Sequence, residues 1–293
     1  MSRTADEIVS QPATWVEALA RSPQVASTLP GSDESVAVIG CGTSFYIAES
    51  FARARDARAR GTSDAAVASE FVVGRRHYDH VLAISRSGTT TEVVRALRRL
   101  PAGLPSVAIS AVGGSPVVDA AGAAVVLDFA DERSVVQTRF ATTTLLLLRA
   151  HLGEDVGRAI LDAAEGVERP LPADPAAFER FVFLGTGWTI GLAHEAALKM
   201  REAALAWSES YPAMEYRHGP ISLAGPGTLV WTLGVEDADL VRDISATGAK
   251  VVVGDLDPLA ELILLQRLAV QLAVAKGLDP DSPRHLTRSV VLS

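Results

Sequence analysis

Four side chains between residues 195 and 218 have the types and spacing needed for acid–base chemistry. Glu195, Lys199 and Glu202 stand at positions i, i+4 and i+7, so a helix would place all three on one face. Further along, His218 precedes a Gly-Pro pair that ends any regular element and fixes a turn. A carboxylate on a helix and an imidazole on a turn can divide the work of base and acid. The simpler alternative is a solvated Glu195–Lys199 ion pair of little energetic value.

The stretch Ser85–Glu92, with the sequence SRSGTTTE, has the composition of a phosphate-binding loop. It contains five hydroxyl side chains and a glycine, and it lies between a strand pattern at 81–85 and a helix pattern at 92–100. The N–H groups and the dipole at a helix start attract anions, and parallel α/β sheets bind ligands at the carboxyl ends of their strands. The alternative is a capping box, in which Thr89 and Glu92 only stabilise the helix end.

The turn Gly40–Ser44, with the sequence GCGTS, also joins a strand pattern to a helix pattern. It is not the dinucleotide-binding fingerprint, because Tyr46 and other large residues occupy the region of the third glycine. The hydroxyl groups of Thr43 and Ser44 could still donate hydrogen bonds to a ligand.

A third polar stretch, Ser134–Thr138 (SVVQT), precedes a helix pattern. Gln137 and Thr138 could donate hydrogen bonds to sugar hydroxyls. A role confined to capping the following helix is an equal alternative.

Composition excludes several classes of function. The chain has 293 residues, a net charge of -8 and a pI near 5.3, whereas partners such as nucleic acid or anionic membranes call for a basic surface. HExxH, paired CxxC and Walker-lysine motifs are absent, so we expect no metal and no cofactor. Cys41 is the single cysteine, which excludes an intramolecular disulfide. Because no signal-like core or membrane-spanning apolar run stands out, we expect a cytoplasmic protein.

Strand and helix patterns alternate along the chain, which predicts parallel sheets covered by helices on both faces. After an amphipathic helix at 13–20, the expected strands cover 35–40, 65–71, 81–85, 106–110 and 124–129, and the expected helices cover 92–100 and 138–151. A proline-containing stretch within 153–174 is the predicted linker. The predicted organisation is an N-terminal helical arm at 1–22, a first domain at 23–165 and a second domain at 175–293.

An internal repeat supports this division. VAVIGCGTSFYIAE at 36–49 aligns without gaps on FVFLGTGWTIGLAH at 181–194, and both glycine pairs are offset by 145 residues, from 185 − 40 and 187 − 42. The second copy is expected to continue with strands near 204–208, 228–233 and 250–253 and a helix at 258–276. It lacks a serine-rich turn like that of the first half, so we expect the anion site in the first half only.

Together these motifs resemble the sugar isomerase (SIS) domain family, and in particular the isomerase half of glucosamine-fructose-6-phosphate aminotransferases. The likeness runs through EIVSQP, IGCGTS, ISRSGTTTE, SVVQTRFATT, FLGTGWTIGLAHEAALKMRE, RHGPISL and PRHLTRSV. It implies two tandem flavodoxin-like domains, each a parallel sheet flanked by helices, in a homodimer that binds a phosphosugar.

The resemblance also implies roles for single residues. Ser44, Ser85, Ser87 and Thr90 match positions that hold the phosphate, and Gln137 matches a position that contacts the sugar.

Glu202 matches the base that moves a proton between C1 and C2 of the sugar. His218 matches the ring-opening histidine, which the neighbouring subunit supplies in that family. Lys199 would steady developing negative charge, or would only pair with Glu195.

Three positions depart from the family pattern. Arg288 stands in place of the lysine that can form a Schiff base, and a guanidinium is no amine nucleophile. Arg86 replaces a glutamine and Thr89 a glutamate, which makes the phosphate loop more positive. Arg86 and Arg288 are therefore added to the candidate ligand-binding residues.

The resulting hypothesis is an enzyme acting at C1 and C2 of a ketose or amino-sugar 6-phosphate. It would be an aldose–ketose isomerase, or an amino-sugar phosphate deaminase or deglycase, using Glu202 to move a proton through an enediol or enolamine. The alternative is a regulatory protein that binds a phosphosugar without turnover, since fold alone does not select between them.

Overall fold

The computed structural model describes residues 2–58 and 61–292 and divides into two compact units. The first unit comprises Ser10–Val156 and Thr287–Ser293, and the second comprises Met1–Val9 and Gly157–Leu286. Residues 1 and 293, which bound the predicted domain ranges, lie outside the described residues. Each unit has its own parallel sheet flanked by helices, so the predicted α/β fold class is confirmed.

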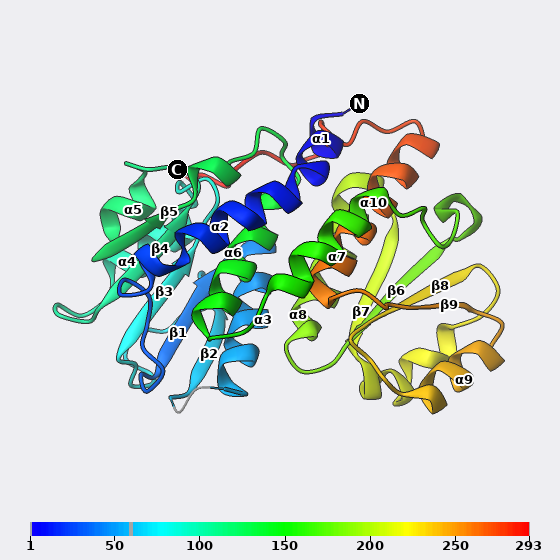
Figure 1. Ribbon diagram of the computed structural model, residues 1–293, viewed down its shortest axis with the longest axis horizontal. Coiled ribbons are helices and arrows are strands. Elements are labelled where there is room, and N and C mark those ends of the chain that lie inside the picture. The colour runs from blue at the N-terminus through cyan, green and yellow to red at the C-terminus, as the bar shows by residue number, and fades with distance from the viewer. Residues whose placement is uncertain (1, 59–60, 293) are drawn as a thin grey trace. The chain divides into compact units, whose positions relative to one another are not determined.

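The first unit contains a five-stranded parallel sheet in the order β2-β1-β3-β4-β5 (Figure 1). Its strands are β1 Val36–Gly40, β2 Ser63–Val67, β3 His80–Ile84, β4 Ser106–Ser110 and β5 Ala123–Val126. This order is flavodoxin-like, and it reverses direction between β1 and β3, where such sheets bind ligands at their carboxyl edge.

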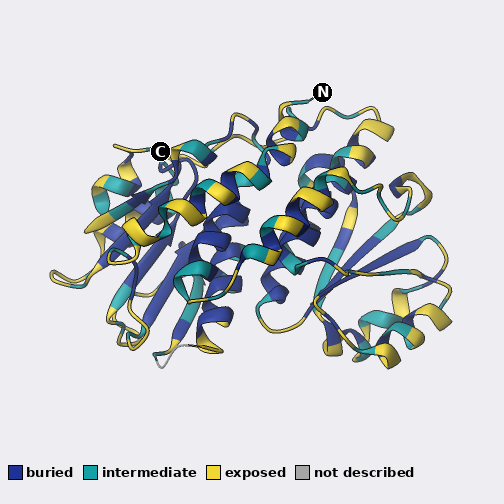
Figure 2. Cartoon of the chain, viewed as in Figure 1, coloured by how far each residue is buried: buried dark blue, intermediate teal, exposed yellow. Residues whose placement is uncertain are grey.

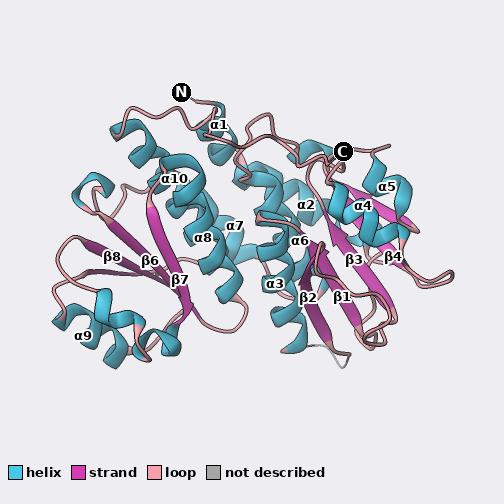
Figure 3. Ribbon diagram, turned by 180° about the vertical axis from the view of Figure 1, so that it is seen from behind, coloured by secondary structure: helices cyan, strands magenta, loops and turns pink. Residues whose placement is uncertain are grey.

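Helices cover both faces of the first sheet (Figures 1 and 3). Helix α4 (Thr91–Arg98) and helix α5 (Pro116–Ala120) bury Val93, Leu97 and Val117 against Ala37 and Ile39 of β1. The helices on the other side are α2 Gln11–Val25, α3 Thr43–Asp56 and α6 Arg139–His151, and a short 3-10 helix, η1 Asp128–Ala130, precedes α6.

The second unit contains a four-stranded parallel sheet in the order β7-β6-β8-β9. Its strands are β6 Arg180–Gly185, β7 Trp207–Pro212, β8 Thr228–Leu233 and β9 Lys250–Val253. The helices are α1 Arg3–Val9, α7 Gly157–Glu168, α8 Thr189–Ala204, α9 Ala238–Ala246 and α10 Pro258–Ala275, with 3-10 helices η2 Pro175–Ala177, η3 Ala213–Arg217 and η4 Pro220–Leu223. Helices α7, α8 and α10 pack together, whereas α9 buries Leu240 and Ile244 against Val182 and Val230. Figure 2 shows α8 and α10 as largely buried helices.

The internal sequence repeat corresponds to a strand–turn–helix unit that occurs twice in the structure. Gly40 ends β1 and Gly185 ends β6, and a Cβ atom on either glycine would lie 2.7 Å and 2.4 Å, respectively, from backbone oxygen of the following helix. Two residues later, Gly42 and Gly187 have φ values of 55° and 53°, which L side chains rarely adopt. Both strands therefore turn sharply onto the start of α3 or α8.

Some element limits differ from the sequence prediction. Helix α8 continues to Ala204 and ends at Leu205, which has φ 48°, so β7 begins at Trp207 rather than at 204. The short helices α5 and α9 were not predicted, because their few turns give only a weak periodic pattern.

The units also differ from the predicted domain ranges at the chain ends. Helix α1 belongs to the second unit, where Thr4 Oγ1 donates to Asp281 Oδ1 at 2.8 Å. Helix α7 also belongs to the second unit, whereas residues 287–292 return to the first unit. Each unit is therefore built from two separate segments of the chain, whereas the predicted ranges made each domain one continuous segment.

Among the described residues, α10 is the one helix long and apolar enough to cross a membrane by length and composition. Two thirds of it, 67%, is buried within the structure. It packs against α7 and α8, so its apolar character is accounted for by its place in a protein core.

Candidate functional site

The charged face of α8 is buried rather than solvated. The side chains of Glu195 and Lys199 are 0% and 1% exposed, and Glu202 retains 20% exposure at the carboxyl end of the helix. Lys199 Nζ lies 3.3 Å from Glu195 Oε1 and also donates to Glu202 Oε2. Because burial of this kind is costly for charges without partners, the simple surface ion pair does not describe these residues.

The electrostatic balance around Lys199 favours its charged form. Burial opposes the ammonium, but the negative charges of Glu195 and Glu202 outweigh this effect and raise the pKa of Lys199. The helix therefore holds a fixed positive charge beside the Glu202 carboxylate.

Glu202 lines a small cavity within the second unit. The cavity has a volume of about 140 Å³, and the other lining residues are Ala203, Leu205, Leu278, Asp279, Ser282, Pro283 and Arg284. Glu202 is thus neither fully enclosed nor turned to bulk solvent, and a small ligand group could reach its carboxylate.

His218 follows η3 and is exposed on the second unit. Its amide donates to Glu215 O at 2.9 Å, and Gly219 follows with φ 132°, so the turn is locally ordered. The neighbouring Arg217 Nη2 lies 3.0 Å from Asp243 Oδ2, which anchors the turn. His218 is not among the residues that line the Glu202 cavity.

The phosphate-loop candidates follow β3 as the sequence indicated. Ser85 and Ser87 are buried, and Ser85 Oγ lies 3.5 Å from Thr90 Oγ1. Thr90 is the N-cap residue of α4 and makes no side-chain cap bond. The hydroxyl of Thr89 bonds Ser87 instead, at 3.2 Å, so the capping box considered for Thr89 and Glu92 does not form.

Gly88 permits the close packing of this loop. It has φ 66°, and a Cβ atom there would lie 2.0 Å from Ser115 Oγ. The loop backbone therefore rests directly on the start of α5, a position open only to glycine.

Thr43 and Ser44 lie in the first turn of α3, and both are buried. Because β1 and β3 are neighbours in the sheet, this turn and the loop 85–92 lie at the same carboxyl edge. Cys41, in the same turn, is no nucleophile candidate, since burial and then the charge of Glu92 raise the pKa of its thiol to about 11.

The amino-terminal end of α6 is capped by Glu132, a residue that the sequence analysis did not single out. Glu132 Oε1 accepts hydrogen bonds from Thr138 N at 2.6 Å, Thr138 Oγ1 at 2.7 Å and Arg139 N at 2.9 Å. The Thr138 side chain makes no cap bond itself. Gln137 is not used in this way, and its buried Oε1 has no hydrogen-bond partner among the described residues.

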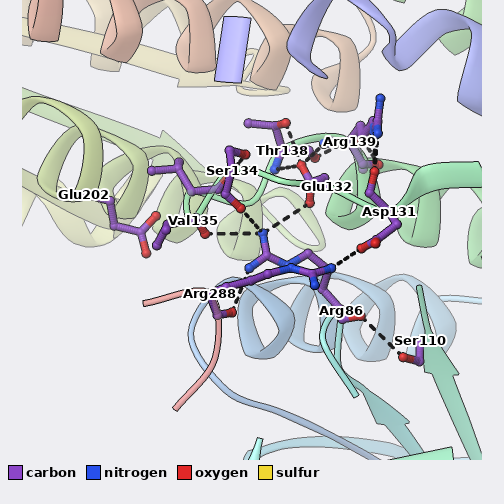
Figure 4. A network of polar contacts seen from close by, with 12 residues as sticks. Arg86, Ser110, Asp131, Glu132, Ser134, Val135, Thr138, Arg139, Glu202 and Arg288 are labelled. Atoms are coloured by element: carbon purple, nitrogen blue, oxygen red, sulfur yellow. Dashed lines mark hydrogen bonds and ion pairs between the residues drawn. The ribbon is translucent and has the colours of Figure 1, made fainter. Parts of the chain in front are cut away.

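The two arginine candidates lie in a polar network of the first unit (Figure 4). The guanidinium of Arg86 is buried and donates to backbone carbonyls, among them Ser134 O at 2.8 Å and Arg288 O at 2.8 Å. The guanidinium of Arg288 pairs with Asp131.

Ser289 is the second residue that sequence reasoning missed. Its hydroxyl lies 3.0 Å from Ser87 Oγ and 2.8 Å from Thr89 Oγ1. It lies about 200 residues from the loop in the sequence, so no local pattern could have linked the two. Among the described residues no group of His, Cys, Asp and Glu side chains could hold a metal ion.

Known proteins resemble this chain along most of its length. No protein-family model matches the sequence. The glutamine–fructose-6-phosphate aminotransferase (isomerizing) of Sulfurisphaera tokodaii is 29% identical over 298 residues, which covers 88% of this chain and 50% of the relative. The enzyme of the same name from Thermus thermophilus is 28% identical, covering 90% of this chain and 53% of the relative. The chain therefore spans about half the length of these relatives.

Solved structures give the same picture. Glucosamine-6-phosphate deaminase from Thermotoga maritima superposes with a TM-score of 0.83, at 25% identity, and the match covers 99% of this chain and 100% of that one. Tagatose-6-phosphate ketose/aldose isomerase from Escherichia coli has a TM-score of 0.78 at 19% identity, over 100% of this chain and 96% of that one, which shows a shared fold.

These findings confirm the resemblance inferred from the motifs. The homologues are the isomerase half of glutamine–fructose-6-phosphate aminotransferases, and the structural neighbours are phosphosugar isomerases and deaminases. The chain is therefore similar to phosphosugar isomerases and deaminases along most of its length.

Proposed function

We propose that the chain is an enzyme acting at C1 and C2 of a ketose or amino-sugar 6-phosphate. The observation that carries the proposal is the buried charge arrangement of α8, which supports Glu202 beside a small cavity. Phosphate binding alone requires no such carboxylate. The names of the relatives and of the neighbour at 25% identity point to fructose and glucosamine 6-phosphates as the first substrates to test.

The proposed chemistry is a proton transfer next to a carbonyl or imine carbon. Glu202 takes the proton from one of the two carbons, which gives an enediol or enolamine, and returns it to the other. Lys199 holds Glu202 in place and adds positive charge near the developing negative charge. Hydroxyls of Thr43, Ser44 and the loop 85–92 bind the phosphate, which orients the sugar.

Arg288 bears on the type of reaction, and Gln137 bears on how the sugar is bound. Arg288 carries no amine that can attack a ketose, and it is paired with Asp131, which favours isomerisation, deamination or deglycation over transfer through a Schiff base. Gln137 offers a buried carbonyl oxygen, which we assign to a sugar hydroxyl. A homodimer in which the partner supplies His218, and a cytoplasmic location, belong to the same proposal.

A substrate panel tests the function. Fructose, glucose, glucosamine and fructosamine 6-phosphates are incubated with the protein, and product sugar and released amine are measured. We expect turnover of at least one substrate, and a loss of about 10²-fold or more in Glu202→Gln, because the amide is no base. Glu236→Gln, at an exposed glutamate of the same unit, is the matched control and should retain activity.

The alternative is a regulatory protein that binds a phosphosugar without turnover. Saturable binding of a panel sugar with no conversion would favour it. Turnover that survives Glu202→Gln unchanged would contradict the role assigned to Glu202.

A further inference from the structure

The carboxyl-terminal tail, residues 287–292, lies along the phosphate loop of the first unit. Thr91 N donates to Val290 O at 3.2 Å, and Leu292 N donates to Thr91 Oγ1 at 2.9 Å. Immediately before Val290, the Ser289 hydroxyl contacts the hydroxyls of Ser87 and Thr89. The tail thus adds the hydroxyl of Ser289 to the row of hydroxyls that Ser85, Ser87, Thr89 and Thr90 form in the loop.

A single guanidinium connects this tail to two other segments (Figure 4). Arg86 Nη2 donates to Arg288 O at 2.8 Å, next to Ser289. Its Nη1 donates to Ser134 O at 2.8 Å and to Val135 O at 3.3 Å, and lies 3.8 Å from Glu132 Oε2. The side chain is 1% exposed, so these bonds are shielded from water. The loop 85–92, the stretch 132–138 and the tail are therefore held together through Arg86.

We propose that Arg86 is a positioning residue, which fixes the tail so that the Ser289 hydroxyl completes the phosphate-binding row. This inference deepens the proposed function and rests on it for the identity of the anion. The guanidinium stays on the backbone carbonyls, and Ser289 rather than Arg86 contacts the phosphate.

The chemistry of the donor explains why arginine is needed. A guanidinium is planar and offers five N–H groups in a fixed fork, so it can bond carbonyls of two segments at once. A glutamine amide has two N–H donors on a shorter side chain, and a lysine ammonium carries its donors at one point. Substitution by either should release the tail before it disturbs the sheet.

Hydrogen exchange tests the tethering without any ligand. In Arg86→Gln, the amides of residues 288–292 and of 133–137 should exchange about tenfold faster or more, as expected when charge-assisted bonds are lost in a local segment. Arg86→Lys should show a smaller increase. Arg95→Gln changes an exposed arginine on the adjoining α4 and should alter neither segment. Unchanged exchange of the tail in Arg86→Gln, with the fold intact, would overturn the tethering.

Phosphate binding tests the assignment of the contact. The affinity for inorganic phosphate is measured in Arg86→Gln, Ser289→Ala and the double variant of the full chain. If Arg86 acts through the tail, the two losses should not add. The double variant should then bind phosphate as tightly as whichever single variant binds it less tightly. Additive losses would instead mean that Arg86 contacts phosphate itself, and would overturn the positioning role.

The two proposals fail in distinguishable ways. Faster tail exchange without any turnover of the sugar panel would sink the proposed function and leave the tether standing. Turnover of a panel sugar, together with unchanged hydrogen exchange of the tail in Arg86→Gln, would support the proposed function and contradict the tethering.

Discussion

Lys199 stands between two carboxylates inside a helix that is buried on nearly all sides. The side chain of Glu195 is 0% exposed, and its Oε1 atom lies 3.3 Å from the Lys199 ammonium. Removing a cation from such a group leaves a buried negative charge, which costs far more than the loss of a surface ion pair. The residue that supports Glu202 is therefore also a residue on which the fold depends.

Lys199→Met should lower the free energy of unfolding by about 3–5 kcal/mol, the range found when one partner of a buried pair is removed. Urea denaturation followed by fluorescence measures the loss. Lys250→Met, at an exposed lysine of β9, is the matched control and should cost less than about 0.5 kcal/mol. Adding Glu195→Gln to Lys199→Met should restore part of the stability, because it removes the stranded charge. A loss no larger than that of the control would contradict the buried-charge interpretation.

At the scale of elements, the strand–turn–helix unit occurs twice with the same two glycines. Gly40 and Gly185 allow close packing of the helix start, whereas Gly42 and Gly187 supply a left-handed backbone in open space. Only the copy in the first unit is followed along the chain by the hydroxyl-rich loop 85–92. The two copies therefore share the backbone turn but not the hydroxyl-rich loop.

The two glycine roles predict different costs in the second unit. In Gly185→Ala the new methyl would lie 2.4 Å from Thr189 O, which cannot yield without moving α8, so we expect a loss of about 3 kcal/mol or more. In Gly187→Ala the methyl meets nothing within 4 Å, and only the left-handed conformation costs about 1 kcal/mol. Urea denaturation of both variants checks this order. Equal losses would contradict the steric explanation.

At the scale of the whole molecule, we propose that the partner subunit of a homodimer supplies His218 to the site of Glu202. His218 is exposed and does not line the cavity of Glu202 in its own unit. A histidine that contacts a neighbouring subunit must be exposed on its own subunit, and the proposal would connect catalysis to assembly.

Mixing inactive variants tests this proposal. Glu202→Gln and His218→Ala dimers are unfolded together, refolded and assayed, beside each variant treated alone. If the partner supplies His218, random reassortment should restore about a quarter of the wild-type activity, since half of the dimers are mixed and each has one intact site. No recovery, with mixed dimers demonstrated by mass spectrometry, would place both residues in a single chain's site.

The sequence alone was sufficient for much of the fold. Glycine turns between apolar strands and amphipathic helices are local signals, and they predicted strands at 106–110, 228–233 and 250–253 with the observed limits. The repeat of 36–49 at 181–194 and the hydroxyl-rich loop 85–92 are also local, so the tandem fold and the candidate anion loop could be read from them.

Only the tertiary structure decided what the polar side chains contact. The sequence made Arg86 a candidate for ligand binding, and the folded chain shows that its guanidinium donates to the backbone carbonyls of residues 134 and 288. It likewise showed that Lys199 is buried between carboxylates, and that Ser289 returns to a loop about 200 residues earlier. Every residue carries the same backbone carbonyl group, so the sequence cannot indicate which carbonyls accept a hydrogen bond from a distant arginine. Periodicity reports the face of an element, whereas partners and burial arise only when distant elements pack together.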